Sequence, residues 1–185
     1  MNNNHKFPKI ALGTWSWGVG AVGGDRVFGN HLGETELKEV FDAAMEAGLN
    51  LWDTATVYGM GASEDILGAF AKTYSREDVL LSTKFTPQIA GNEADPVAAM
   101  CDASLKRLGA DSIDVYWIHT PADVEKWTPG LVSLVKSGKV KQVGVSNHNL
   151  AQIKRAEEIL SKEGVHLSAV QNHFSLLYRS SEDGG

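Results

Sequence analysis

Short apolar runs rich in β-branched and aromatic residues alternate along the chain with segments in which apolar residues recur every three or four positions. The runs predict buried strands, and segments such as Leu37 to Ala44 predict amphipathic helices. The six expected strands are Lys9 to Thr14, Leu49 to Trp52, Val79 to Thr83, Ile113 to Ile118, Gln142 to Val145 and Leu167 to Val170. This alternation is typical of parallel strands joined by helical crossovers.

Residues that begin and end helices fall where this pattern needs them. Asp, Asn, Ser and Thr cap helix starts, proline suits the first turn, and glycine follows the last turn. The expected starts are Ser63, Asp95 with Pro96, Thr128 with Pro129, and Asn149 with Gln152, and the expected stops are Gly109, Gly138 and Gly164. The helices are therefore short, and none needs a long connection.

Polar reactive residues stand at the ends of consecutive expected strands, at Asp53, Lys84, His119, Asn147 and Gln171. An open doubly wound sheet concentrates its site at one switch point, whereas a barrel uses many strand ends. We therefore expect an α/β fold of the (β/α)₈ TIM-barrel type. Only about six of the eight βα units are present, so the prediction is a single partial barrel domain over residues 1–185.

Three glycines, Gly18, Gly20 and Gly23, match the G-x-G-x-x-G pattern of dinucleotide-binding turns. In that motif the last glycine already lies inside the helix whose N-terminus holds the pyrophosphate. Here Gly24 to Arg26 are expected to continue a loop up to about Gly33. The segment is therefore interpreted as a flexible loop.

Composition narrows the class of protein. The formal net charge is −6, with lysines and arginines scattered along the chain, which argues against nucleic acid as a partner. Cys101 is the single cysteine, so neither an internal disulfide nor a thiolate metal cluster is expected. With no signal-like or membrane-length apolar segment, a cytoplasmic protein without membrane attachment is expected.

Four residues suggest acid–base chemistry. Asp53 follows a strand, Tyr58 comes five residues later, and Lys84 and His119 end the next two strands. A lysine near a phenol favours phenolate and lowers the phenol pKa, an aspartate is its natural counter-ion, and a histidine can orient a carbonyl. Taken one at a time, each also has a structural interpretation: Asp53 as a turn cap, Tyr58 as packing, Lys84 as a surface lysine and His119 as a structural histidine.

The sequence resembles the aldo-keto reductases, especially their bacterial members and the related β-subunits of voltage-gated potassium channels, from about Pro8 to Arg179. The resemblance rests on five motifs in order, which are Asp53-Thr54-Ala55 with Tyr58-Gly59, Ser82-Thr83-Lys84-Phe85, Ile118-His119-Thr120-Pro121, Gly138-Lys139-Val140 leading into Gly144-Val145-Ser146-Asn147, and Val170-Gln171-Asn172. It implies that Tyr58 is the general acid, Lys84 tunes it, Asp53 fixes Lys84, and His119 orients a substrate carbonyl.

The resemblance also implies a nicotinamide cofactor, NADPH with NADH as the other choice, whose carboxamide is held by Ser146, Asn147 and Gln171. Ser146 and Asn147 also suit a helix cap. The residues that grip the phosphates would follow the sixth unit, so the chain is expected to be truncated there. Its activity is an open question, and association through open barrel edges is a further expectation.

The expected function is the reduction of aldehydes or ketones to alcohols, and the alternative is a truncated or non-catalytic cofactor-sensing module of the same fold. Trp15, Trp17 and Trp52 could line an apolar substrate pocket or pack in the core. His148 and His173 have no metal-ligand spacing with His119, so no catalytic metal is expected. The carbonyl substrate and the oligomeric state are not specified by the sequence.

Overall fold

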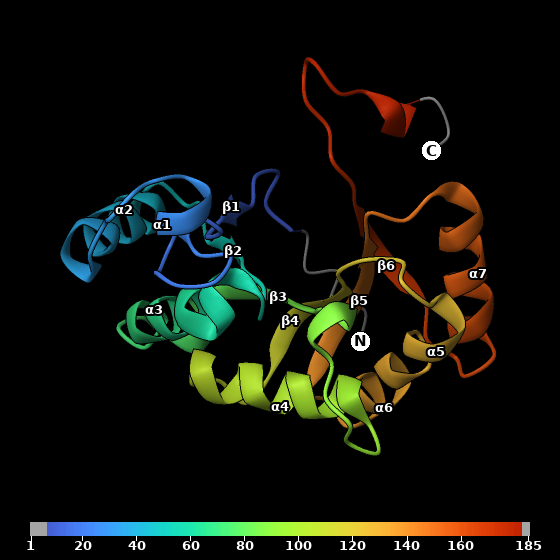
Figure 1. Ribbon diagram of the computed structural model, residues 1–185. Coiled ribbons are helices and arrows are strands. Elements are labelled where there is room, and N and C mark those ends of the chain that lie inside the picture. Colours follow the sequence, from blue (N-terminus) through green and yellow to red (C-terminus); the bar gives the residue numbers. More distant parts are fainter. Residues whose placement is uncertain (1–6, 183–185) are drawn as a thin grey trace. The chain divides into compact units, whose positions relative to one another are not determined.

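The computed structural model describes residues 7–182, which divide into two compact units. The first unit contains the chain up to Ser82 together with residues 107–109, and the second contains the remainder. Strand β3 (Leu80–Phe85) contributes its first half to one unit and its second half to the other. The hydrogen-bonded strand order is β1-β2-β3-β4-β5-β6, which follows the chain (Figure 1).

The first unit is built on the parallel strands β1 (Leu12–Gly13) and β2 (Leu51–Asp53) and the beginning of β3. Its helices are α1 (Gly24–Val27), α2 (Glu34–Glu46) and α3 (Ala62–Ala71), with 3₁₀ turns η1 (Tyr58–Gly61) and η2 (Arg76–Asp78). The backbone amide of Thr14 donates to Asp53 and that of Thr54 donates to Ser82, so the parallel pairing continues just past both strand ends.

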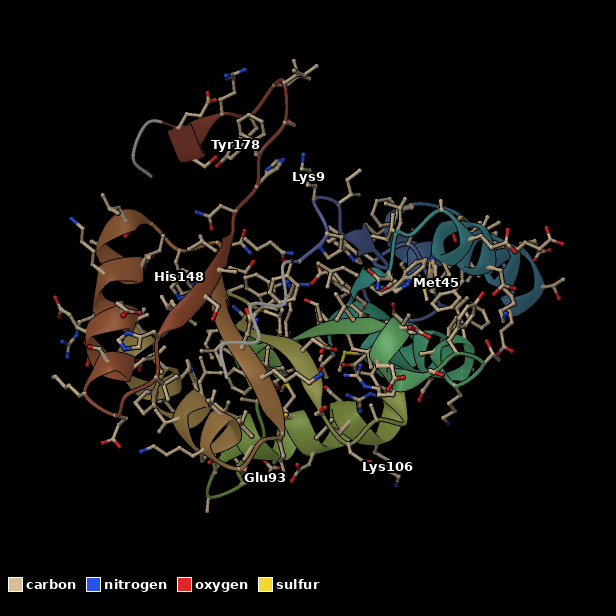
Figure 2. All side chains as sticks on the ribbon, turned by 180° about the vertical axis from the view of Figure 1, so that it is seen from behind. Lys9, Met45, Glu93, Lys106, His148 and Tyr178 are labelled. Carbon is tan, nitrogen blue, oxygen red and sulfur yellow. The ribbon has the colours of Figure 1, made fainter. Side chains whose placement is uncertain are left out.

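Aromatic rings form the core of the first unit. Trp52 stacks on Phe41 with 4.5 Å between ring centroids, and Trp17 lies 5.3 Å from Trp52 and 5.8 Å from Phe70. The Trp52 indole N–H points at the sulfur of Met45, which is labelled in Figure 2. Trp17 and Trp52 are thus buried core residues, which is the second of the two roles that the sequence left open for them.

The second unit continues with the end of β3, then β4 (Ile113–Ile118), β5 (Val140–Ser146) and β6 (Leu167–Gln171). The β4–β5 and β5–β6 pairs are parallel. Its helices are α4 (Pro96–Leu108), α5 (Val124–Trp127), α6 (Gly130–Lys136) and α7 (Leu150–Ser161), with 3₁₀ turns η3 (Pro87–Ile89) and η4 (Ser180–Glu182). Helix α6 packs on β5 and α7 on β6.

Two of the expected helix starts are confirmed by side-chain caps. The Asp95 carboxylate accepts from the amide of Ala98 at 3.0 Å, and Asn149 with Gln152 forms a reciprocal capping box at α7. Alternating strand and helix, with parallel pairing throughout the described register, is the expected α/β pattern. Among residues 7–182 no helix has the length and apolar character that crossing a membrane requires.

Three local expectations are wrong. Ser63 lies inside α3 instead of capping it, and its hydroxyl bonds to Thr14. Thr128 does not start the helix expected up to Gly138, because it closes a separate preceding turn, α5, which Asp123 caps by accepting from the amide of Lys126; α6 itself lies undivided within the expected range. Residues 24–27 form one helical turn, α1, where a continuous loop was expected.

Candidate functional site

Chemically reactive side chains occupy the carboxyl ends of consecutive strands. Asp53 is the last residue of β2, Lys84 is next to last in β3, and His119 directly follows β4. Ser146 and Gln171 are the last residues of β5 and β6. This is the position that (β/α) barrels reserve for their functional groups.

In the first unit, the Asp53 carboxylate is anchored by a serine of the next strand. Asp53 and Ser82 are register partners across β2 and β3, and the Ser82 hydroxyl donates to Asp53 Oδ1 at 2.6 Å. Both residues are buried. A short bond from a hydroxyl to a carboxylate is one of the stronger kinds, so Ser82 fixes the orientation of the acid.

Buried hydroxyls tie the two strand ends to the start of α3. The Ser63 hydroxyl donates to the Thr14 carbonyl at 2.7 Å and accepts from the Thr54 hydroxyl at 3.1 Å. It also lies 2.7 Å from the Thr14 hydroxyl. The sequence suggested that Ser63 caps a helix. Instead, Ser63 supports the strand ends through contacts with residues that lie far away along the chain.

Tyr58 begins the η1 turn and its ring is buried. Burial raises the pKa of the phenol well above its usual value near 10, and the negative charge of Asp53 raises it further. The direction is opposite to the lowering expected from a neighbouring lysine, because both effects seen here favour the neutral phenol. Tyr58 therefore keeps its proton at ordinary pH.

One face of the Tyr58 ring is covered by Trp15. The two rings stack with centroids 5.5 Å apart and an interplanar angle of 15°. Trp15 remains partly exposed, unlike the two core tryptophans, so the interpretation of Trp15 as part of a substrate pocket stays a prediction.

In the second unit, Lys84 is buried to the extent that only 1% of its surface is exposed. Side chains two residues apart leave the same face of a strand, so Lys84 and Ser82 share one face of β3. This burial makes the interpretation of Lys84 as a surface lysine wrong. A buried lysine is costly unless it is paired.

His119 is held at the end of β4 by the segment that follows β3. Its backbone amide donates to the carbonyl of Phe85 at 2.9 Å, and its Nδ1 lies 3.0 Å from the hydroxyl of Thr86. The contact fixes the plane of the imidazole ring. Sequence reasoning missed Thr86, whose only signal was its position two residues after Lys84.

Asn147 joins three strand ends of the second unit. Its side-chain amide donates to the His119 carbonyl at 3.0 Å and to the Ser146 hydroxyl at 3.1 Å, and its backbone amide donates to the Gln171 carbonyl at 3.0 Å. Its backbone is left-handed, with φ of 61°, a conformation that asparagine tolerates better than most residues. The structure thus brings together His119, Ser146, Asn147 and Gln171.

These groups have the donor and acceptor set that a nicotinamide carboxamide requires. The Ser146 hydroxyl accepts from Asn147, so its own hydrogen is directed elsewhere and can donate to a carbonyl oxygen. The side-chain oxygens of Asn147 and Gln171 are acceptors for an amide N–H. The residues present therefore fit the carboxamide end of the cofactor.

A cavity of about 250 Å³ adjoins this cluster in the second unit, and it is lined by Asn147, His148, Asn149, Asn172, His173, Tyr178, Ser180 and Ser181. His148 Nδ1 donates to the Ser146 carbonyl at 2.7 Å, which makes Nε2 the unprotonated nitrogen. Burial lowers the pKa of His148, so the ring is neutral. In the part of the chain that is described, its Nε2 atom has no hydrogen-bond partner.

Comparisons with a family model and with individual known proteins indicate the same family. The model of the aldo/keto reductase family matches residues 9–184. Aldo-keto reductase str7 of Strobilurus tenacellus is 36% identical over 80% of this chain and 45% of its own length, and the chloroplastic pyridoxal reductase of Arabidopsis thaliana is 31% identical over 94% and 50%. The chain thus spans about half the length of these relatives.

Solved structures agree with the fold. A thermostable aldo-keto reductase in complex with the inhibitor epalrestat superimposes with a TM-score of 0.79 at 26% identity, covering 100% of this chain and 64% of its own. An aldo/keto reductase from Klebsiella pneumoniae in complex with NADP and acetate gives 0.64 at 28% identity, covering 80% and 48%. These similarities confirm the predicted fold, an incomplete (β/α)₈ barrel.

Proposed function

Because the chain belongs to the aldo/keto reductase family, we propose that it is an oxidoreductase that reduces aldehydes or ketones to alcohols with NADPH. The observation that carries the proposal is the placement of Asp53, Lys84, His119, Ser146 and Gln171 at the carboxyl ends of five consecutive strands. Five separate strands supply these groups, so chance placement is a poor explanation.

Tyr58 supplies the proton in this proposal. Its phenol stays neutral because it is buried beside Asp53, so a hydrogen is available for a carbonyl oxygen as negative charge develops there. Asp53 is fixed by Ser82, and Lys84 and His119 take the tuning and carbonyl-orienting roles that the family resemblance implies.

The carboxamide cluster orients the cofactor. Ser146 and Gln171 bind the amide group of the cofactor. Asn147 holds the ends of β5 and β6 together and fixes the position of His119 through the bond to its carbonyl. When bound, the reduced nicotinamide supplies a hydride to the carbonyl carbon. NADPH is proposed over NADH because relatives with NADP exist among solved structures of the family.

The test is the Tyr58→Phe variant, which keeps the ring that stacks on Trp15 and removes only the hydroxyl. Oxidation of NADPH with an aldehyde panel should slow by about 10²-fold or more, with the Kd for NADPH unchanged. Tyr74→Phe is the matched control, since it removes another phenol that donates to a carboxylate, Asp42, at 3.0 Å. Unchanged turnover in Tyr58→Phe contradicts the assignment.

The same experiment separates the alternative function. NADPH binding without turnover on any aldehyde would identify a cofactor-sensing module. Turnover that depends on the Tyr58 hydroxyl identifies an enzyme.

A further inference from the structure

The segment that follows β3 holds the backbone of Thr86 at both its amide and its carbonyl. Thr86 is extended, with φ of −110° and ψ of 104°, as is usual for a residue before a proline. Its amide points at the sulfur of Met100 at 3.3 Å, and its carbonyl accepts from the amide of Ile89 at 3.1 Å. A β-branched side chain has few rotamers, so this backbone gives the Thr86 hydroxyl a fixed direction.

The Thr86 hydroxyl is directed at the imidazole of His119. Thr86 is buried, and its Oγ1 atom lies 3.0 Å from Nδ1 of His119. Among residues 7–182 this hydroxyl has no other hydrogen-bond partner. A hydroxyl oxygen has two lone pairs but only one hydrogen, and a buried hydrogen without an acceptor is costly. Donation from Thr86 to Nδ1 is the arrangement that satisfies that hydrogen.

This donation determines which nitrogen of His119 carries the ring hydrogen. A neutral imidazole has hydrogen on one of its two nitrogens, and the hydrogen bond made by one nitrogen sets the state of the other. Because Nδ1 accepts from Thr86, the hydrogen of His119 is on Nε2. The backbone of His119 is fixed as well, since its amide donates to Phe85 and its carbonyl accepts from Asn147. The ring therefore presents its Nε2–H in one direction.

His148, which is labelled in Figure 2, shows the opposite arrangement in the same unit. Its Nδ1 lies 2.7 Å from the carbonyl oxygen of Ser146, and a carbonyl oxygen can only accept. His148 therefore carries its hydrogen on Nδ1. The two histidines differ because one Nδ1 faces a hydroxyl and the other faces a carbonyl.

We infer that Thr86 is a positioning residue, which donates to Nδ1 and thereby holds His119 as the tautomer whose Nε2–H donates to a substrate carbonyl. The inference rests on the proposed function, because that function gives His119 the role of orienting the carbonyl. Thr86 acts through the imidazole and transfers no proton to the substrate itself.

The first test reads the tautomers directly and needs no turnover. The chain is labelled with ¹⁵N-histidine, and long-range ¹H–¹⁵N spectra are recorded at about pH 8, above the ordinary histidine pKa of about 6.5. His119 should show a bare Nδ1 and a protonated Nε2, and His148 should show the reverse. Loss of each set of signals in His119→Gln or His148→Gln assigns them. Hydrogen on Nδ1 of His119 overturns the inference.

The second test removes the hydroxyl. In Thr86→Val the Nδ1 signal of His119 should move to higher ¹⁵N frequency, as a bare ring nitrogen does when it loses a hydrogen bond, and Thr86→Ser should restore it. Thr120→Val is the matched control, because it removes a hydroxyl next to His119 that accepts from the side chain of Gln88 at 2.8 Å. It should leave the signal in place. An unchanged Nδ1 signal in Thr86→Val shows that the bond is absent and overturns the inference.

Turnover connects the tautomer to the reaction. In Thr86→Val, kcat/KM for an aldehyde should fall about 10-fold while the Kd for NADPH is unchanged, as expected for the loss of one orienting hydrogen bond. Thr86→Ser and Thr120→Val should stay within about twofold of the parent chain. Equal turnover in Thr86→Val and an active parent overturns the inference. If the chain reduces no aldehyde while the ¹⁵N pattern is as expected, the proposed function fails and the control of the His119 tautomer by Thr86 stands.

Discussion

Ser82 donates a 2.6 Å hydrogen bond to the carboxylate of Asp53, the residue opposite it across strands β2 and β3. Lys84 leaves the same face of β3 as Ser82. The serine therefore links the acid at the end of one strand to the strand that carries the lysine, and it was not among the residues that sequence reasoning selected as functional.

Ser82→Ala tests this link. Removing the hydroxyl takes a short hydrogen bond away from a buried carboxylate, so the free energy of unfolding should fall by about 1–3 kcal/mol. Ser133→Ala, which removes an exposed hydroxyl that donates to the Gly130 carbonyl at 3.2 Å, should cost less than about 0.5 kcal/mol. Urea denaturation of both variants measures the difference, and equal stabilities would show that the Ser82 bond contributes nothing.

The strained backbone at Val22 predicts an unusual response to glycine. Val22→Gly relieves a left-handed conformation that costs an L-residue about 1–2 kcal/mol, which offsets the greater freedom of glycine in the unfolded chain. Val40→Gly, at an exposed position inside α2, has no strain to relieve and should lose about 1 kcal/mol.

Thermal unfolding of the two valine variants gives the comparison. The expected order is that Val22→Gly is at least as stable as the parent chain and Val40→Gly is less stable. Similar destabilisation of both would mean that the Val22 conformation carries no strain.

Sequence reasoning found all six strands because each is an apolar run that can be identified without knowledge of its neighbours. It also found the caps at Asp95 and Asn149, where the hydrogen-bond partner lies three residues away. It failed at Ser63, whose partner Thr14 is 49 residues distant, since local pattern cannot reveal such a contact. Secondary structure set by near neighbours was therefore predictable.

The residues of the candidate site could be predicted from the sequence, but their burial and protonation could not. Asp53, Tyr58, Lys84 and His119 lie on or near the expected strand ends. The raised pKa of Tyr58 could not be predicted, because it depends on burial and on a nearby carboxylate, and the sequence shows neither. Roles for Trp15, Trp17 and Trp52 likewise depended on packing that only the structure supplies.

Burial of His148 makes the stability of the chain depend on pH. Folding lowers the pKa of the ring below its ordinary value of about 6.5, so below that pH the unfolded chain binds a proton that the folded chain binds less readily. Stability that is present above this value is therefore lost as the pH falls. Between about pH 8 and pH 5, His148→Gln should lose less stability than the parent chain. If the unfolding midpoints of His148→Gln and of the parent chain change with pH in the same way, His148 is not a buried neutral histidine.

Asn147→Gly probes the carboxamide cluster without a backbone penalty, because glycine readily adopts the left-handed conformation found there. Loss of the bonds to His119 and Ser146 should weaken NADPH binding about 10-fold, the equivalent of one hydrogen bond of about 1.4 kcal/mol. Asn50→Ala, which removes an exposed amide bonded to the Asp78 carbonyl, is the control. Quenching of tryptophan fluorescence reports the Kd, and equal values for both variants would exclude Asn147 from the cofactor site.

The most direct measurement follows the hydrogen itself. The chain is incubated with benzaldehyde and NADPH that carries deuterium at the transferable position of C4, and the alcohol is examined by mass spectrometry. The account predicts one deuterium on the carbinol carbon and unlabelled hydrogen on the oxygen, with the yield sharply reduced in Tyr58→Phe. Formation of unlabelled alcohol, or no alcohol from a chain that is folded and binds NADPH, would contradict it.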